Sequence, residues 1–188
     1  VNPNAAISLE VAGKVTITNC TFGSESDTAG YMYNGLEFSQ SRAMADTTIS
    51  GKTFYGGAFR HNCISFYMMQ EGATINISGN KFVDLNWDST NAVRISNYTN
   101  ATATVNLDRN DYSDHGSEGS KDYAGLLVFQ QVDDQKDDFT KLTVNISDLD
   151  YQSKSQLFYV YYDSIISTNQ PKITGDSSIE KFFVAKVG

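Results

Sequence analysis

The chain has 188 residues with 22 acidic and 14 basic side chains, which gives a formal net charge of −8. This acidic balance argues against binding to nucleic acids or to anionic membrane surfaces, because both attract basic proteins. No run of the sequence approaches the roughly 18 apolar residues that a membrane-spanning helix needs, so we expect no membrane insertion.

The first predicted strand covers residues 7–11, in which Ile7, Leu9 and Val11 alternate with polar residues. Such alternation has the period of a half-buried β-strand. The segment matches the later apolar stretch of the repeat described next, at residues 36–38, not its first strand. We therefore expect the chain to open in mid-coil, with an upstream coil, another domain or a partner covering that end.

A sequence motif of eight residues, called the repeated phrase below, then occurs five times. In each copy an aromatic ring follows one aliphatic residue by five positions and a second by seven, except that Thr47 replaces the second in one copy. The copies cover residues 15–22, 47–54, 75–82, 105–112 and 144–151. A repeat of this length cannot bury its own apolar face, so successive copies must stack on one another.

Each repeat contains three predicted strands. Alternating residues form the first strand, a Gly-Lys, Gly-Asn or Asn-Cys pair suits a tight turn, and the aromatic residue lies on the second strand. A further apolar stretch supplies the third strand, at residues 36–38, 64–66, 93–95, 126–129 and 158–160. Three short strands in about 30 residues are typical of one coil of a parallel β-helix.

Two other architectures fit this pattern less well. A β-sandwich would place turns about every 8–12 residues without a repeated register, and a leucine-rich repeat would show helical periodicity between strands. The sequence therefore predicts an all-β, parallel β-helix solenoid of about five to six coils over residues 1–175, with residues 171–175 as a degraded sixth copy. Residues 176–188 are predicted to form a C-terminal cap or an interface segment.

The loops after the aromatic residues carry the candidate site residues, because loops at equivalent positions stack on one side of a solenoid. Hydrolysis of a polysaccharide would require two carboxylates about 5–9.5 Å apart, in a groove with aromatic side chains. The catalytic candidates are Asp84, Asp88, Asp111, Asp114 and Glu118, and the candidate ligand-binding residues are Trp87, His115 and Tyr123.

Two features argue against catalysis. The outward positions of the first strands hold Thr, Ser and Asn with one carboxylate, Asp108, whereas a catalytic cleft on that face would need several. Lys52, Arg60 and Arg94 are isolated basic residues, and no acidic calcium-binding cluster accompanies them as a lyase would require. The sequence therefore favours a non-enzymatic protein, with a polysaccharide hydrolase or lyase as the alternative.

The two cysteines, Cys20 and Cys63, fall at different corners of the predicted coil, so we expect no disulfide bond between them. Neither lies near a histidine at a spacing suited to a metal ion, and no nucleotide-binding motif is present. We therefore predict two buried thiols, no metal site and no cofactor.

One outward row on the third strands becomes apolar toward the C-terminus. The predicted row runs through Glu37, Ser65, Arg94, Leu127 and Tyr159, with Tyr161 beyond it. Such a surface fits burial against another subunit, or beneath a loop of the same chain. The residues predicted to lie at an interface are Leu127, Tyr159, Tyr161, Phe182 and Phe183.

The phrases at 15–22 (Val-Thr-Ile-Thr-Asn-Cys-Thr-Phe) and 75–82 (Ile-Asn-Ile-Ser-Gly-Asn-Lys-Phe) resemble coils of the right-handed parallel β-helix, pectate-lyase-like superfamily. The resemblance covers roughly residues 7–175 and implies the fold rather than an activity, because the superfamily includes lyases, hydrolases, adhesins and inert spacers. The amino-acid composition, rich in Ser, Thr, Asn and Tyr and poor in Pro, is similar to that of tailspikes, fibres and capsid decoration proteins of tailed bacteriophages. That resemblance implies a trimeric, extracellular component of a particle.

These observations predict a structural β-helix module on a large assembly, a bacteriophage virion above all, that buries surface and presents loops. The expected partners are further copies in a homotrimer, other proteins of the particle and surface glycans. The expected location is the virion or an extracellular surface. The alternatives are a glycan-binding or glycan-cleaving tailspike-type domain and a repeat of a bacterial surface adhesin.

Overall fold

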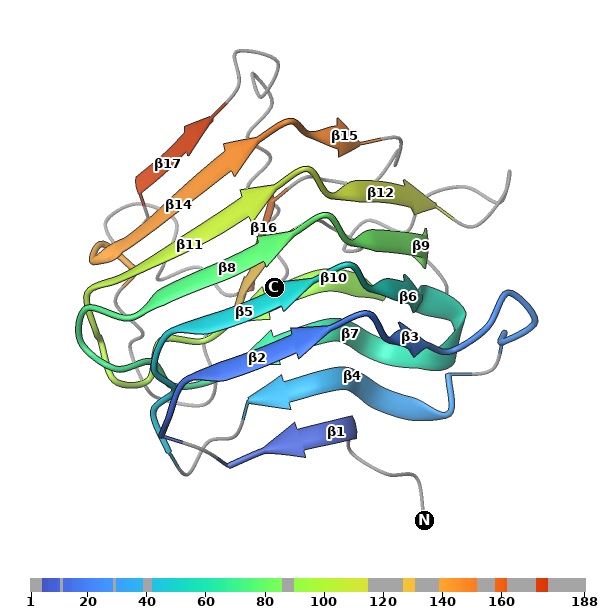
Figure 1. Cartoon of the computed structure of the whole chain (residues 1–188), viewed down its shortest axis with the longest axis horizontal. Helices are drawn as coiled ribbons and strands as arrows, with labels where there is room; N and C mark the ends of the chain where they lie inside the picture. Colours follow the sequence, from blue (N-terminus) through green and yellow to red (C-terminus); the bar gives the residue numbers. More distant parts are fainter. Residues whose placement is uncertain are drawn as a thin grey trace.

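The repeated phrase forms the rungs of a parallel β-solenoid, as a computed structural model of the chain shows (Figure 1). The structure describes residues 5–10, 12–28, 30–38, 42–85, 90–114, 127–130, 139–151, 158–161 and 172–175, with the backbone alone at 114, 127–130, 151 and 158–161. The predicted all-β parallel β-helix is confirmed, with about four turns in place of the five to six coils expected. The C-terminal repeats are described only in short pieces. Residues 176–188, the predicted cap, lie outside the described ranges.

Three parallel sheets form the walls of the solenoid. Sheet A contains β1 (Ala5–Leu9), β4 (Met32–Phe38), β7 (Phe59–Phe66), β10 (Asn91–Ile95), β13 (Leu127–Gln130) and β16 (Phe158–Tyr161). Sheet B contains β2 (Val15–Thr18), β5 (Thr47–Ser50), β8 (Thr74–Ser78), β11 (Ala103–Asp108), β14 (Leu142–Ser147) and β17 (Lys172–Gly175). Sheet C contains β3 (Thr21–Phe22), β6 (Thr53–Tyr55), β9 (Lys81–Leu85), β12 (Asp111–Asp114) and β15 (Asp150–Tyr151).

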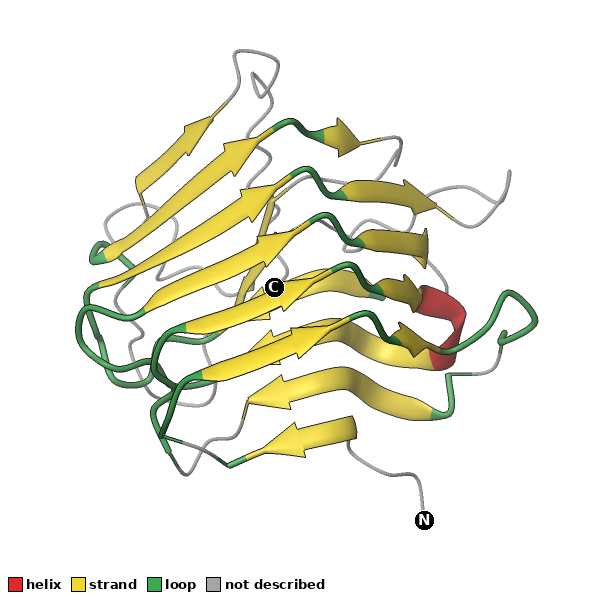
Figure 2. Ribbon diagram, in the orientation of Figure 1, coloured by secondary structure: helices red, strands yellow, loops and turns green. Residues whose placement is uncertain are grey.

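The chain passes through the sheets in the order B, C, A, so each coil lies on the one before it. The short 3₁₀ turn η1 (Gly56–Ala58) joins β6 to β7, and Figure 2 shows it as the single helical segment among the described residues. Gly56 is needed at this corner, because a Cβ atom there would lie 2.3 Å from the carbonyl oxygen of Asp84. The strand β1 pairs with β4 in sheet A, which confirms that residues 7–9 match the later apolar stretch of a coil, the one at residues 36–38, and not its first strand.

The register of sheet B follows the repeated phrase. The first aliphatic position of each copy is aligned with the next, in the row Val15, Thr47, Ile75, Val105, Val144 and Ile173. The alignment of Ile173 with Val144 confirms the predicted sixth copy of the first strand at Lys172–Gly175. Thr47 is buried in this apolar row, and its hydroxyl donates a hydrogen bond of 3.1 Å to the Ala45 carbonyl. That bond compensates the cost of placing a polar group inside.

The aromatic residues of the phrase stack along the axis. The ring centroids of Phe22 and Phe54 are 4.8 Å apart, those of Phe54 and Phe82 5.2 Å, and those of Phe82 and Tyr112 5.0 Å. Neighbouring rings are within 6° of parallel. Since strands in a sheet lie about 4.8 Å apart, the ring spacing follows directly from the backbone.

The turn between sheets B and C places one residue of every coil in the left-handed region. These residues are Asn19 (φ 54°), Gly51 (63°), Gly79 (60°), Arg109 (50°) and Asp148 (48°). Glycine and asparagine adopt this conformation readily, which is why the turn was visible in the sequence. Arg109 shows that stacking on neighbouring coils imposes the same turn on a residue that disfavours it.

The central ring of the stack should contribute most to stability. We expect Phe82→Ala to lower the free energy of unfolding by about 3–5 kcal/mol, because Phe82 is fully buried between Phe54 and Tyr112. Phe22→Ala is the matched control, because Phe22 lies at the end of the described stack. Urea unfolding measures both, and an equal or larger loss for Phe22→Ala would contradict the stacking argument.

Candidate functional site

The structure describes part of the predicted site. Asp88, Glu118, Trp87, His115, Tyr123, Phe182 and Phe183 lie outside the described residues, and only the backbone is described for Asp114, Leu127, Tyr159 and Tyr161. Their proposed roles stay predictions. Asp84 and Asp111 are described in full, so their placement can be examined.

Asp84 and Asp111 lie on neighbouring strands of sheet C but are offset along them. Asp111 is aligned with Lys81, and Asp84 lies three residues further along β9. Three residues of extended chain span about 10 Å, in addition to the strand spacing. Asp84 also lies in the stretch between Phe82 and Leu85 where the register between β9 and β12 shifts, and it has a φ of 55°. The backbone therefore does not set these two carboxylates side by side.

The predicted interface row needs one correction. In sheet A, Leu127 is aligned with the buried Val93, and Val128 is aligned with Arg94. Leu127 therefore falls in the register of the inward row, and Val128 takes the place that the sequence analysis gave to Leu127. Tyr159 is aligned with Val128, as expected for the outward row. Four consecutive apolar residues at 126–129 gave no alternation from which the correct alignment could be chosen.

The outward face of sheet A is already covered around Arg94. Ser65 is 0% exposed and Arg94 is 5% exposed within the single chain. The Arg94 guanidinium lies 4.5 Å from the centroid of the Tyr67 ring and donates a hydrogen bond of 3.2 Å to the Ser65 hydroxyl. This cation–π contact was missed from the sequence, because Tyr67 follows β7 whereas Arg94 lies on β10 in the next coil.

The outward face of sheet B carries a ladder of amides. Asn106 donates to Asn76 and Asn145 donates to Asn106, each at 2.8 Å, and the Thr174 hydroxyl donates to Asn145. A second ladder lies on sheet A, where Asn62 donates to Asn34 at 2.8 Å and Asn91 donates to Asn62 at 3.3 Å. In contrast to the sheet B ladder, its members Asn34 and Asn62 are buried. An amide can donate to one neighbour and accept from the other, which suits it to a stack of coils.

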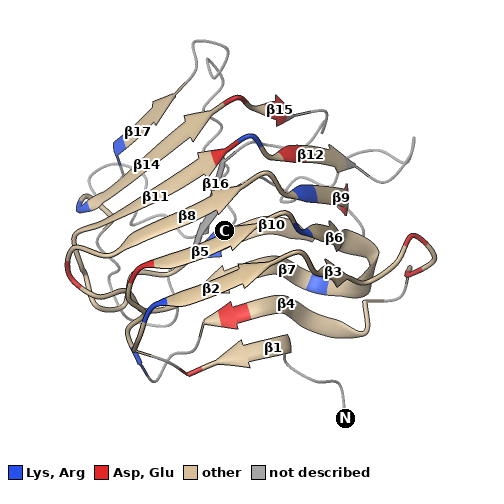
Figure 3. Cartoon of the chain, in the orientation of Figure 1, with Lys and Arg blue, Asp and Glu red and all other residues tan. Residues whose placement is uncertain are grey.

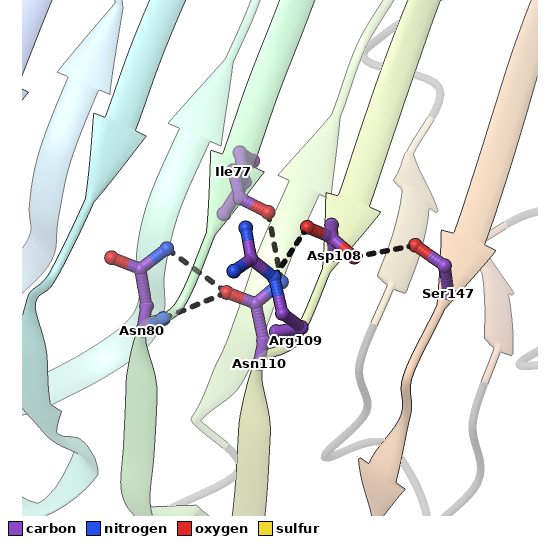
Figure 4. A network of polar contacts seen from close by, with 6 residues as sticks. All are labelled: Ile77, Asn80, Asp108, Arg109, Asn110 and Ser147. Carbon is purple, nitrogen blue, oxygen red and sulfur yellow. Dashed lines mark hydrogen bonds and ion pairs between the residues drawn. The ribbon is translucent and has the colours of Figure 1, made fainter.

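A third ladder lies inside the turn between sheets B and C (Figure 4). The Asn80 side chain donates to the Asn110 side-chain oxygen at 3.0 Å and to the Ile49 carbonyl at 3.1 Å. The Asn110 side chain donates to the Ile77 carbonyl at 2.8 Å. Both asparagines are almost fully buried. The repeated turn gives no direct signal of this ladder beyond the Asn at equivalent positions of two copies.

Along sheet B, charged side chains gather at the ends of the strands. Strands β2, β5, β8 and β14 contain no acidic or basic residue, as Figure 3 illustrates. At one corner Lys14 and Asp46 form an ion pair of 3.5 Å beside Gln70 and Glu71, in a shallow hollow of about 210 Å³. At the next corner Arg109 contacts Asp108 at 2.7 Å.

Three corner carboxylates accept hydrogen bonds from the following coil. The Thr74 amide donates to Asp46 at 2.9 Å, the Thr102 amide donates to Glu71 at 2.9 Å, and the Ser147 hydroxyl donates to Asp108 at 2.7 Å. These bonds are the main reason that the pKa of each carboxyl is lowered from its ordinary value. A lowered pKa keeps the group ionised, whereas a general acid needs a raised one.

One exposed aromatic surface was not predicted. Tyr33 is 36% exposed and stacks on His61 of the next coil, with ring centroids 5.0 Å apart and planes within 7°. The Arg60 guanidinium lies 6.0 Å from the Tyr33 centroid, and Tyr31 beside it is 56% exposed. Tyr33 and His61 each precede a buried asparagine of the sheet A ladder, a recurrence that the sequence could have revealed.

Cys20 is exposed and Cys63 is buried, and both are free. The prediction of two buried thiols is therefore wrong for Cys20. Its turn lies at the edge of the described stack, with a neighbouring coil on one side, whereas Cys63 lies inside sheet A. Burial raises the pKa of the Cys63 thiol, which makes it unreactive.

Comparison with known proteins gives no relative: no family model, no curated protein and no solved structure matches the chain. Within the described ranges, no group of three His, Cys, Asp or Glu side chains is arranged to hold a metal ion. The described part of the chain also holds no helix with the length and hydrophobicity needed to cross a membrane.

The buried and the outward amide ladders should differ in their contribution to stability. Asn110→Ala removes the partner of the Asn80 amide and of the Ile77 carbonyl inside the turn, so we expect a loss of about 1–3 kcal/mol for each group left without a partner. In Asn106→Ala, water can replace the lost bonds, so we expect a loss below about 1 kcal/mol. Urea unfolding compares them, and similar losses would contradict this assignment.

The carboxylates of Asp46, Glu71 and Asp108 should make the free energy of unfolding depend on pH. The ordinary pKa values are 3.8 for aspartate and 4.5 for glutamate, and the folded values are lower. The unfolded chain therefore binds more protons below pH 4.5, so the free energy of unfolding should fall as the pH drops through this range.

The control is the triple variant Asp46→Asn, Glu71→Gln and Asp108→Asn, whose unfolding free energy should fall less steeply between pH 5 and pH 3, a range chosen to span the ordinary carboxyl values of about 4. Urea unfolding at several pH values measures both slopes. Equal slopes in the two proteins would assign the acid sensitivity to other groups.

Proposed function

We propose that the chain is a non-enzymatic structural module, a rigid β-helical rod exposed on a large assembly. The observation that carries this proposal is the direction of the outward hydrogen bonds. On sheet B the amides of Asn76, Asn106 and Asn145 bond to one another along the axis at 2.8 Å, so they join coils to coils. An outward amide already engaged on both sides has less capacity to bind a ligand.

The state of the acidic groups supports the same function. Asp46, Glu71 and Asp108 have lowered pKa values because they accept hydrogen bonds from the next coil. Carboxylates of this kind stabilise the stack and remain ionised near neutral pH. A glycosidase acid needs the opposite shift, and its partner carboxylate must lie within about 5–9.5 Å.

We place the module on a bacteriophage particle, as part of a capsid decoration, a fibre or a tailspike-like protein, located on the virion or at an extracellular surface. The amino-acid composition of the sequence supports this assignment. The stack of coils with polar outward side chains supports it as well. Partners would be copies of the chain, in a trimer, or other proteins of the particle. The net charge of −8 makes free copies of the chain repel one another in solution. This repulsion favours solubility before a copy binds a specific partner.

Glycan recognition is the second candidate function, and the exposed rings of Tyr31 and Tyr33 favour it. They lie beside the Arg60 side chain, whose Nε donates a hydrogen bond of 2.8 Å to the Gly30 carbonyl and is thereby held in place. Exposed aromatic rings with a fixed polar neighbour provide both apolar contact and orientation for a ligand. This surface would serve a tailspike or an adhesin as well as a spacer.

The two functions are separated by measuring the mass of the chain by light scattering, with and without a panel of bacterial polysaccharides. A structural module should give a defined oligomer that neither binds nor shortens any polysaccharide. Binding that is lost in Tyr33→Ala and kept in Tyr55→Ala would favour glycan recognition. Shortening of a polysaccharide, abolished by Asp84→Asn or Asp111→Asn, would overturn the non-enzymatic proposal.

A further inference from the structure

We propose that Cys20 and Lys52 form an oxidant-sensitive pair, in which hydrogen peroxide leads to a covalent sulfur–nitrogen bond between the first two coils. The two residues occupy the same turn position on neighbouring coils, since Thr21 is aligned with Thr53 and Thr18 with Ser50. This is the position that Asn80 and Asn110 take in the following coils. The inference is independent of the proposed function.

Both side chains fold back onto equivalent carbonyl groups. The Cys20 thiol donates to the Thr18 carbonyl at 3.4 Å, and the Lys52 ammonium donates to the Ser50 carbonyl at 2.8 Å. Because Thr18 and Ser50 are register partners, these carbonyls are about one strand spacing, 4.8 Å, apart. The thiol and the ammonium therefore fold back onto equivalent points of neighbouring coils, and they are close enough for Cys20 to influence the pKa of Lys52.

The Ser50 carbonyl also shows on which side the ammonium lies. It accepts a hydrogen bond of 3.3 Å from the backbone N–H of Asn19, so it points toward the first coil. Lys52 Nζ binds the same oxygen and thus lies in the interval between the coils, beside the residue that precedes Cys20. The amine is in this way directed toward the thiol rather than toward solvent.

The two groups differ in access, as a reactive pair requires. Cys20 is exposed and can meet a small oxidant, whereas Lys52 is 1% exposed. Among the described residues, Ser50 supplies the one acceptor for the three N–H groups of this buried ammonium. Burial lowers the pKa of Lys52, and the neighbouring Cys20 opposes this shift to a smaller extent. A larger share of the amine is then neutral and nucleophilic.

The reaction balances in two steps. Cys20 sulfur attacks one oxygen of hydrogen peroxide, the O–O bond breaks, and water leaves, so that the sulfur is oxidised to a sulfenic acid and the peroxide is reduced. The neutral Lys52 amine then attacks the sulfur, the S–O bond breaks, and a second water leaves with a proton from nitrogen. The product is a sulfenamide, and the chain has lost two hydrogen atoms. This bond would fasten β3 to β6 at the edge of the stack.

Mass spectrometry of the intact chain tests the proposal. After brief treatment with hydrogen peroxide, we expect a decrease of about 2 Da that dithiothreitol reverses, since the sulfur is at the sulfenyl oxidation level. Trypsin should no longer cleave after Lys52, and the peptide beginning at Val15 should be joined to the one containing Lys52. Cys63→Ser should behave like the natural chain.

Lys52→Arg keeps a positive charge but has no comparable amine, so it should lose the cross-link and gain oxygen at Cys20 instead. A urea-unfolded sample of the natural chain provides a control that does not depend on a variant folding, and it should not form the cross-link. The proposal is overturned if the folded natural chain only gains oxygen at Cys20, or only forms Cys20–Cys20 disulfides between copies. It is also overturned if the mass decrease persists in Lys52→Arg.

Discussion

Alignment between successive coils is the constraint on which the rest of this structure depends. Parallel strands place each residue beside its counterpart in the next coil, so one favourable choice is repeated along the axis. Phe54, Phe82 and Tyr112 stack inside the solenoid while Asn106 and Asn145 bond outside it, and both rows obey the same register. A slip of one residue would turn the rings outward and the amides inward, so inner and outer ladders protect the same alignment.

Asparagine recurs in these ladders because its short side chain carries a donor and an acceptor. In the buried turn, Asn80 and Asn110 satisfy backbone groups that no strand can pair, which a solvent-facing amide need not do. Where the ladder meets Cys20 and Lys52, the same turn is filled by reactive groups instead. The chemistry of a position in this fold is thus set by its neighbours along the axis more than by its neighbours in the chain.

The fold could be predicted from the sequence because its two periods, alternation within strands and recurrence between coils, are both visible in the residue types. The sixth copy at Ile173 was found in this way. Leu127 was placed one position off, since a run of apolar residues has no alternation. The exposure of Cys20 depends on whether a coil packs against its turn, which no local pattern records. The contact of Arg94 with Tyr67 joins side chains from different coils, so it follows from the stacking alone.

The coil is also a unit of length. Each coil adds about 4.8 Å along the axis. The face that it offers to the next coil is of the same kind as the face on which it rests. Insertion or loss of a whole coil between equivalent turns would leave the flanking rings and amides facing partners of the same kind. The reach of such a rod can therefore change in fixed increments by duplication or deletion of gene segments, while its cross-section stays the same.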